Sequence, residues 1–392
     1  MRIGIVLSET PSYSETFFTS KIKGLQKHGF KVTLFVQHKK DDFNLCEVRV
    51  APKVYKRNLI LLLGSGLIVF FRGFLKYNRF LKFIELEREY GRSKKQMLKN
   101  LYNNSHLLTA DLDWIHFGFA TIAIQSEHVA KVIGAKMAVS FRGFDLDVYP
   151  LKYTGCYELL WNQVDKVHSI SNYLLNTAYN IGLPKSVSYQ IITPAICVPE
   201  HFKKQDSEKT SAFKIVTVAR LHWMKGLQDT LEALAMLKSK QIAFKYIIIG
   251  SGIQYENLKY AIFQLGIEDY VILEGQKTHE ETMAVLEDSD MYIQYSHSEG
   301  FCNAVLEAQG RGLLCITSDG GGLQENIIHG KTGWMVPKRQ PKLLAETIIN
   351  VMNLPVEEKR RMRANAINHV NSNFDVKNQA EQFVTFYSEH TD

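Results

Sequence analysis

Residues 291–312, MYIQYSHSEGFCNAVLEAQGRG, show the local pattern from which the fold class can be predicted. A short apolar run comes first, a polar loop follows, and the segment from Asn303 has the apolar spacing of a helix. The second half of the chain repeats this order. We predict its strands at 214–218, 244–249, 270–273, 291–294 and 314–317. Short buried strands that alternate with helices are typical of an α/β fold with parallel sheets.

The first half shows the same rhythm less regularly. Its predicted strands are 3–7, 31–36, 114–117, 136–141, 166–169 and 187–192. A chain of 392 residues is long enough for two hydrophobic cores. We therefore predict two Rossmann-like domains whose sheets face a cleft, because ligands of open α/β sheets bind at the carboxyl ends of the strands. The predicted division is 1–199, a polar linker at 200–212, 213–370, and a C-terminal helix at 371–392 that packs back toward the first domain.

The cysteines and the N-terminus indicate the compartment. Five cysteines are scattered without a C-x-x-C pair or a Cys/His cluster, so neither a disulfide framework nor a structural zinc site is expected. The first residues, MRIGIVLSETPS, read as a buried strand rather than as a signal peptide. We expect a cytoplasmic protein, at the inner face of the cytoplasmic membrane if it meets lipid.

The charge is distributed unevenly along the chain. The net charge is +7, but residues 1–205 hold 28 Lys and Arg against 16 Asp and Glu, and the remainder holds 19 against 24. Most of the surplus lies between Arg49 and Lys99, where 13 basic residues face three glutamates, and within it, in 57–83, basic residues alternate with aromatic and aliphatic ones. The mostly apolar run at 59–71 has thirteen residues, which falls short of the ~20 that span a bilayer. The sequence of 57–83 fits peripheral contact with a membrane, and it also fits a buried helix with a solvated basic face. Nucleic acid is not expected as a partner, because no nucleic-acid-binding motif accompanies the charge.

Two glutamates in the opening stretch suggest a sugar nucleotide site. Glu299 and Glu307 stand eight residues apart, and Gly300 permits a tight turn after the first. The next amides, of Phe301, Cys302 and Asn303, would then form an anion site at a helix N-terminus. Glu307 could accept hydrogen bonds from ribose hydroxyls and Glu299 could meet a sugar. The alternative is that a strand, loop and helix contain two glutamates by chance.

A second element supplies cations. Residues 214–226, KIVTVARLHWMKG, bring Arg220 and Lys225 into the loop after a strand, where both could reach one pyrophosphate. Taken alone, they could equally be ordinary surface charges. Glycines at the ends of nearby strands, where a nucleoside could lie against backbone, are Gly250, Gly252 and Gly275. Tyr255 occupies the place of the third glycine of a dinucleotide fingerprint, which disfavours a nicotinamide enzyme.

In order and spacing, R-x4-K-G, I-G-S-G, E-G-Q, E-G-F-x5-E, G-G-L-Q-E and G-K-T-G-W-M-V-P resemble family 4 of the retaining GT-B glycosyltransferases. The likeness covers the C-terminal half. The first half is similar more loosely, through SETPSYSETFF, H-F-G at 116–118, F-R-G-F-D at 141–145 and ISNYL at 170–174. These motifs resemble the branch that builds bacterial exopolysaccharides, including colanic-acid-type enzymes.

The resemblance implies a retaining transferase. Arg220 and Lys225 would bind the donor diphosphate, Glu307 the ribose, and Glu299 with the following amides the sugar. It implies front-side attack, in which the leaving phosphate helps to deprotonate the acceptor, with no metal and no cofactor. The donor would be a UDP- or GDP-linked hexose or N-acetylhexosamine, and the acceptor a lipid-linked polysaccharide or another glycan.

The chain departs from the family pattern in two places. Arg142 stands where many relatives have the cleft histidine, so we list it with the catalytic residues as a contact for a phosphate or an acidic sugar. Ser14 and Glu15 replace a Gly-Gly loop; they could bind donor or acceptor, or cap a helix. His116 and Asp145 are candidate acceptor-binding residues, although His116 also fits a buried strand-end histidine.

Other functions stay open at this point. An epimerase or a phosphorylase could use the same double-domain plan, and a membrane-associated scaffold could keep the fold without catalysis. The triplets 111–113 and 145–147 read D-x-D, the metal-binding pattern of GT-A enzymes, but D-x-D is common by chance and two cations make a metal unnecessary.

Overall fold

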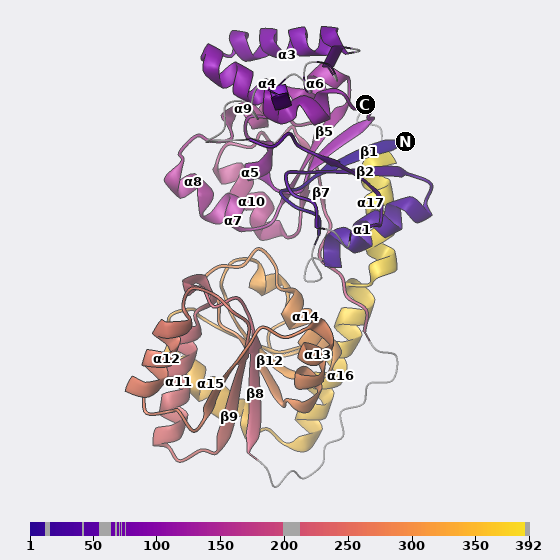
Figure 1. Ribbon diagram of the computed structural model, residues 1–392. Coiled ribbons are helices and arrows are strands. Elements are labelled where there is room, and N and C mark those ends of the chain that lie inside the picture. Colours follow the sequence, from indigo (N-terminus) through magenta and orange to yellow (C-terminus); the bar gives the residue numbers. More distant parts are fainter. Residues whose placement is uncertain are drawn as a thin grey trace. The chain divides into compact units, whose positions relative to one another are not determined.

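The computed structural model describes residues 1–11, 16–40, 43–54, 64–66, 69, 71, 73–74, 76–198 and 212–388. The chain forms two compact units (Figure 1). The first comprises Met1–Ile170, Leu174–Ile192 and Ala380–Asp392, and the second comprises Ser171–Tyr173 and Thr193–Gln379. Ser14, Glu15 and all but the last residue of the predicted linker 200–212 lie outside the described residues.

A parallel sheet of seven strands forms the centre of the first unit, in the order β3-β2-β1-β4-β5-β6-β7. Its strands are β1 (Arg2–Val6), β2 (Lys31–Val36), β3 (Glu47–Val50), β4 (Trp114–Phe117), β5 (Lys136–Phe141), β6 (Lys166–Ser169) and β7 (Ser188–Ile191). All six predicted strands are present. The sequence analysis missed β3, because this edge strand is only partly buried and its sequence, EVRV, has no apolar run.

Helices cover this sheet and complete its core. They are α1 (Thr16–Lys27), α3 (Tyr77–Glu89), α4 (Lys94–Leu108), α5 (Ala120–Ala123), α6 (Val129–Ile133), α7 (Phe144–Asp147), α8 (Tyr149–Lys152), α9 (Glu158–Trp161), α10 (Asn172–Asn180) and the larger part of α17 (Val376–Ser388). Phe383, Phe386 and Tyr387 of α17 belong to the same buried cluster as Ile5 and Leu34 of the sheet. The last helix of the chain therefore supplies core residues to the first unit.

The second unit holds a parallel sheet of six strands in the order β10-β9-β8-β11-β12-β13. These are β8 (Phe213–Val218), β9 (Phe244–Ile249), β10 (Val271–Gly275), β11 (Met291–Gln294), β12 (Leu314–Ser318) and β13 (Trp334–Val336). The five predicted strands are confirmed, whereas β13, of three residues, is too short to give a period. The helical elements are η1 (Trp223–Lys225), α11 (Leu227–Ser239), α12 (Tyr255–Gln264), α13 (His279–Asp288), α14 (Asn303–Gly310), η2 (Gly322–Glu325), α15 (Pro341–Met352) and α16 (Val356–Asn373).

The central strands β11 and β12 are buried on both faces, which explains why they are mostly apolar. Successive side chains of β11 point to opposite faces. Ile293 accordingly joins the cluster that contains Leu231 of α11 and Ile348 of α15, whereas Tyr292 joins the cluster that contains Val305 of α14. Such a sheet brings the carboxyl ends of β8 to β12 to one edge, and the predicted donor residues occupy the loops that follow those strands.

Candidate active site

Backbone hydrogen bonds join the loops at the carboxyl edge of the second sheet. The Leu221 amide donates to the Ser251 carbonyl oxygen at 2.9 Å, which ties the loop after β8 to the loop after β9. The His297 amide donates to the Met224 carbonyl oxygen at 2.7 Å, which ties the same loop to the one after β11. The segment that carries Arg220 and Lys225 is therefore held from both sides.

Two of the predicted nucleoside-contacting glycines permit this close packing. Gly250 has a φ of 141°, and a Cβ atom there would lie 2.0 Å from the Ala219 carbonyl oxygen. A Cβ atom on Gly252 would lie 2.4 Å from the Leu221 carbonyl oxygen. The Gly250 amide donates to the Gly275 carbonyl oxygen at 2.8 Å, so that amide is used within the protein. These glycines let the Arg220 segment lie directly on the loop after β9.

Arg220 and Lys225 both act on His222, which lies between them in the loop. Burial lowers the pKa of His222, and the charges of Arg220 and Lys225 lower it further. His222 also accepts a long hydrogen bond of 3.4 Å from the Met224 amide at the start of η1. The Arg220 side chain is exposed, whereas Lys225 is partly buried. The two cations are thus part of one positively charged loop.

Lys225 forms an ion pair with Glu299, and the side chains are 15% and 12% exposed. The same carboxylate oxygen accepts hydrogen bonds from Ser296 Oγ at 3.0 Å and from Gln294 Nε2 at 3.3 Å. Gln294 is held in turn by the Tyr292 hydroxyl at 2.6 Å. Lys225 and Glu299, which were predicted to bind phosphate and sugar, therefore contact each other. Gln294 and Ser296, which were not predicted as site residues, hold Glu299 in place.

The glycine turn after β12 fastens the backbone of this loop. The Glu299 amide donates to the Gly320 carbonyl oxygen at 3.2 Å, and the Gly322 amide donates to the Glu299 carbonyl oxygen at 2.7 Å. A Cβ atom on Gly322 would lie 1.9 Å from the Gly300 carbonyl oxygen, so only glycine fits. The Gly322 amide is therefore engaged by the backbone of Glu299.

The N-terminus of α14 corrects another prediction. The Cys302 amide donates to Asn326 Oδ1 at 3.0 Å, and Asn326 Nδ2 donates back to the Cys302 carbonyl oxygen at 3.0 Å. This amide is therefore occupied and does not form the predicted anion site. The Phe301 ring packs against Phe374, with centroids 5.6 Å apart. Burial raises the pKa of the Cys302 thiol to about 12, so the thiol stays protonated. Asn303, the third residue of the predicted anion site, is the first residue of α14.

Glu307 lies one turn inside α14, and its side chain is 19% exposed. Burial raises the pKa of Glu307 to about 7, although Arg311 opposes that shift. His279, at the start of α13, places Nδ1 3.9 Å from Glu307 Oε1, and burial lowers the pKa of His279. A carboxylate that accepts hydrogen bonds from a diol is stabilised in its ionised form. Hydrogen bonds from hydroxyls to Glu307 would therefore favour its ionised form.

In the first unit, Asp145 is a structural residue and not a contact for an acceptor. Its side chain is 1% exposed. Its carboxylate accepts hydrogen bonds from the amides of Arg142 at 3.0 Å, Gly143 at 2.9 Å and Ala120 at 3.2 Å. Burial raises the pKa of Asp145, and these amides counteract that rise. The carboxylate shapes the turn after β5, the turn that begins with Arg142.

Arg142 packs on aromatic rings of α1. Its guanidinium carbon lies 3.7 Å from the centroid of Phe17 and 4.6 Å from that of Phe18. Such stacking is favourable for a cation and orients the planar guanidinium group. Arg142 also contributes to the lowered pKa of the buried Lys21.

His116 is fully buried in β4, which matches the alternative of a satisfied strand histidine and contradicts acceptor contact. Its Nε2 lies 2.7 Å from Ser140 Oγ, and its Nδ1 lies 2.6 Å from the Tyr387 hydroxyl and 3.2 Å from Lys21 Nζ. Burial and the charge of Lys21 hold the pKa of His116 well below its usual value. A neutral imidazole thus links the sheet to α17.

The D-x-D triplets are engaged in other contacts. Asp111 accepts hydrogen bonds from Lys76 at 3.0 Å and Arg79 at 2.7 Å, and Asp113 pairs with Arg2 at 3.1 Å. In the part of the chain that the structure describes, no three His, Cys, Asp or Glu side chains gather as metal ligands would.

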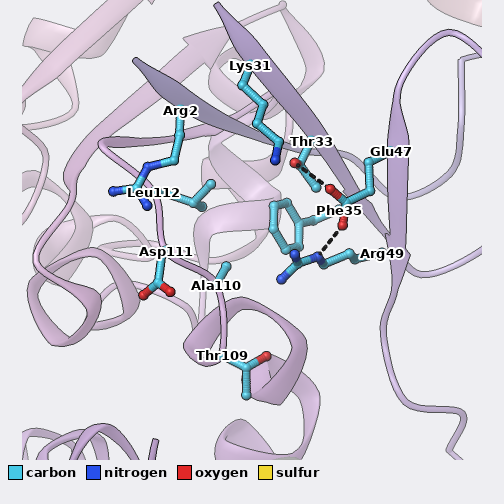
Figure 2. Close-up of a pocket in the computed structure, with 10 residues that line it drawn as sticks. All are labelled: Arg2, Lys31, Thr33, Phe35, Glu47, Arg49, Thr109, Ala110, Asp111 and Leu112. Atoms are coloured by element: carbon cyan, nitrogen blue, oxygen red, sulfur yellow. Dashed lines mark hydrogen bonds and ion pairs between the residues drawn. The ribbon is translucent and has the colours of Figure 1, made fainter.

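A cavity of about 200 Å³ lies in the first unit (Figure 2). Arg2 and Lys31, in its lining, are the first residues of β1 and β2, so the cavity lies at the amino ends of the strands. Within this lining Arg49 pairs with Glu47 at 2.8 Å (Figure 2), whereas Arg2 pairs with Asp113 and Asp111 pairs with Lys76 and Arg79, outside the lining. Ligands of open α/β sheets bind at the opposite edge, so this cavity is not the candidate site.

Comparison with known proteins supports the family resemblance. Residues 199–369 match the family model described as glycosyl transferases group 1. The chain is 25% identical over 376 residues to the colanic acid biosynthesis glycosyltransferase WcaL of Escherichia coli K12, covering 91% of this chain and 92% of that protein. It is 29% identical over 281 residues to the amylovoran biosynthesis glycosyltransferase AmsK of Erwinia amylovora, covering 69% of each.

Solved structures share the fold. Anabaena HepE, in complex with UDP and glucose, superposes with a TM-score of 0.73 at 14% identity, covering 99% of both chains. Sucrose-phosphate synthase of Thermosynechococcus elongatus gives a TM-score of 0.69 at 15% identity, covering 98% of each. The two parallel sheets, the matched motifs and these similarities agree: the chain is a glycosyltransferase with the GT-B fold, and its residues 199–369 match the glycosyl transferases group 1 model.

Proposed function

We propose that this glycosyltransferase moves a hexose or an N-acetylhexosamine from a UDP- or GDP-linked donor to a lipid-linked polysaccharide intermediate, with retention of configuration. The names of WcaL and AmsK, which concern colanic acid and amylovoran, support an exopolysaccharide product. The UDP and glucose in the HepE complex support a nucleotide sugar donor. The observation that carries the proposal is the ion pair of Lys225 and Glu299, beside Arg220 on one sheet edge.

The ion pair suggests how the donor binds. A diphosphate carries more negative charge than a carboxylate, so it would compete with Glu299 for the Lys225 ammonium group. Glu299 would then be able to accept hydrogen bonds from hydroxyls of the sugar. Arg220, exposed in the same loop, would hold the other phosphate. Both cations would stabilise the charge that grows on the departing nucleoside diphosphate, without a metal or another cofactor.

The proposed transfer forms one bond and breaks one bond on the same face of the sugar. The bond from the anomeric carbon to the phosphate oxygen breaks, and the acceptor oxygen bonds to that carbon. The leaving phosphate oxygen takes the proton of the acceptor hydroxyl, so no protein nucleophile is needed. The thiol of Cys302, with its raised pKa, is not suited to that role.

In the first unit we assign Arg142 to an anionic group of the acceptor or donor. Its guanidinium group is already oriented by Phe17 and Phe18, so little conformational entropy is lost on binding. A lipid-linked acceptor places the reaction in the cytoplasm at the inner face of the membrane, with peripheral contact through 57–83. Residues 57–63, 67–68, 70, 72 and 75 of that segment lie outside the described residues.

The test is a comparison of matched lysine variants. Lys225→Ala should lower the rate of sugar transfer by about 10²- to 10³-fold, the loss typical of removing one group that stabilises developing charge. Lys259→Ala, which removes an exposed lysine of α12 in the same unit, should transfer sugar at the rate of the unaltered chain. Equal rates for both variants would refute the assigned role of Lys225.

Calorimetry and the sugar transfer assay together separate the transferase from the alternative functions. A scaffold would bind neither UDP nor GDP in calorimetry. An epimerase would convert a nucleotide sugar with no acceptor present, and a phosphorylase would depend on inorganic phosphate. Transfer that needs an acceptor and releases a nucleoside diphosphate supports the transferase, and an unchanged anomeric configuration in the product supports retention.

A further inference from the structure

Three large apolar side chains are exposed in the loops at the carboxyl edge of the second sheet. Trp223 of η1 is 54% exposed, Ile253 in the loop after β9 is 80% exposed, and Tyr255, the first residue of α12, is 45% exposed. Single exposed hydrophobic residues are normal on a protein surface. Three of them on two adjoining loops beside a candidate active site are typical of a surface that binds a ligand.

Backbone hydrogen bonds join the two loops that carry these side chains. The Gln254 amide donates to the Leu221 carbonyl oxygen at 3.1 Å, beside the hydrogen bond of the Leu221 amide described above. Trp223 follows Leu221 by two residues, and Ile253 and Tyr255 flank Gln254. The edge cluster, which consists of Trp223, Ile253 and Tyr255, therefore starts from neighbouring backbone segments.

The backbone turn that carries Trp223 is fixed. The Lys225 amide donates to the His222 carbonyl oxygen at 2.9 Å, and the Gly226 amide donates to the Trp223 carbonyl oxygen at 3.3 Å. The His222 ring lies near the indole, with centroids 5.5 Å apart and planes tilted by 37°. The lowered pKa of His222 keeps its imidazole neutral, so this neighbour adds no charge to the indole. A ligand can therefore bind Trp223 with little loss of backbone freedom.

The edge cluster is separate from the predicted ribose contact. Side chains of α11 and α12 pack on one face of the second sheet, and those of α14 pack on the other (Figure 1). Trp223 immediately precedes α11 and Tyr255 begins α12, whereas Glu307 belongs to α14. Arg220 and Lys225 flank Trp223 in one loop. The cluster thus lies beside the residues proposed to bind the diphosphate and at the opposite face from the ribose contact.

We propose that the edge cluster is a subsite for a sugar ring of the acceptor glycan, with Trp223 stacked on the apolar face of that ring. A pyranose ring carries C–H groups on its faces and hydroxyls at its edge, so its face displaces water from an indole while its hydroxyls stay solvated. The side chains of the cluster carry no charge, so they suit a neutral ring better than a phosphate.

The proposal rests on the proposed function in one respect, because it takes the acceptor to be a polysaccharide intermediate. Such an acceptor has several sugar rings. A ring beyond the one that reacts can therefore occupy the edge cluster while the donor occupies Arg220, Lys225 and Glu307.

Iodide quenching of tryptophan fluorescence tests the subsite directly. Trp114 and Trp161 are 3% and 4% exposed, and Trp334 is partly buried. Trp223 is therefore the tryptophan most open to iodide among the four in the chain. Oligosaccharides prepared from colanic acid and from amylovoran should lower the quenching of the unaltered chain toward that of Trp223→Phe, and UDP or GDP alone should not. Quenching that neither oligosaccharide lowers overturns the proposal, as does equal shielding by UDP alone.

Calorimetry with the same oligosaccharides measures what the indole contributes. Trp223→Ala should raise the dissociation constant about tenfold, because roughly half of the indole surface loses its contact with the sugar. Trp223→Tyr should recover most of this affinity, since tyrosine also offers an aromatic face. Phe263→Ala is the matched control: it removes an aromatic side chain of α12 that is 66% exposed and should bind the oligosaccharides as the unaltered chain does. Equal losses in Trp223→Ala and Phe263→Ala overturn the proposal.

Nucleotide calorimetry on the same samples keeps the two proposals apart. Binding of UDP or GDP without shielding by oligosaccharides removes the subsite and leaves the transferase proposal intact. Shielding without affinity for either nucleotide does the reverse. Trp223→Ala should bind the nucleotide as tightly as the unaltered chain; a loss of that affinity would show that the indole supports Lys225 and would overturn the subsite. Far-ultraviolet circular dichroism of every variant excludes unfolding as the cause.

Discussion

Replacing Glu307 with Gln should stabilise the protein and weaken donor binding at the same time. The pKa of this carboxyl group is about 7 in the folded chain, against 4.5 for an ordinary Glu. Because the folded pKa is the higher one, the folded state binds more protons between pH 4.5 and 7, and stability falls as pH rises through that window. The difference corresponds to about 3 kcal/mol of unfolding free energy. Glu307→Gln removes this loss, since the amide does not ionise.

Urea denaturation measures the stabilisation. At pH 8 the variant should exceed the unaltered chain by up to about 3 kcal/mol, and at pH 4 the two should be nearly equal. Glu346→Gln, on the exposed side of α15, is the matched control and should show no such difference. Equal stability of Glu307→Gln and the unaltered chain at pH 8 would show that ionisation of the buried Glu307 carboxyl group does not destabilise the protein.

Calorimetry measures the effect on binding. If the donor ribose binds the ionised carboxylate, affinity for a nucleotide sugar should rise about tenfold from pH 6 to pH 8, following the ionised fraction of a group with a pKa of about 7. Binding at pH 6 should release a proton. UDP-glucose and GDP-mannose are suitable probes, because their diphosphates keep the same charge over this range. In Glu307→Gln the affinity should be low at both pH values, and a pH dependence that survives the substitution would assign it to another group.

Three further substitutions test contacts of the two units. Asn326→Ala should lower the unfolding free energy by about 1–3 kcal/mol, because it leaves the buried amide of Cys302 without its acceptor; an unchanged melting temperature would contradict this. Gly322→Ala should reduce transfer while the chain stays folded, because the new methyl group would displace the backbone at Gly300; wild-type kinetics would show that the loop tolerates the shift. Tyr387→Phe should cost about 0.5–1.5 kcal/mol through the lost hydrogen bond to a buried imidazole, measured by urea denaturation, and an equal midpoint would argue against that bond.

The strands were the part of the fold that local sequence predicts best. β9 and β11 are mostly apolar because helices cover both faces of their sheet, and the helices between them show the helical period. β3 and β13 were missed for the opposite reason, since one is a half-exposed edge strand and the other has three residues. The local sequence pattern thus predicts buried strands well, and it predicts half-exposed edge strands and very short strands poorly.

The sequence predicted which residues form the candidate site, but it did not predict which side chains contact one another there. Arg220, Lys225, Glu299 and Glu307 all follow strands whose carboxyl ends share one edge, which is a consequence of parallel topology that the sequence pattern indicates. The partner of each side chain depends on which loops meet in space. Asn326 binds Cys302 across 24 residues, and Lys225 binds Glu299 across 74. No periodicity carries information about such pairs.

Local sequence was enough to predict the α/β class, the two parallel sheets, the loops that carry the predicted donor residues and the family resemblance. These features depend on neighbours along the chain, through hydrophobic period and glycine spacing. The burial of His116 and Asp145, the engaged Cys302 amide and the raised pKa of Glu307 became apparent only in the folded chain. Burial and hydrogen-bond partners are set by segments far apart in sequence, so they exist only once the chain has folded.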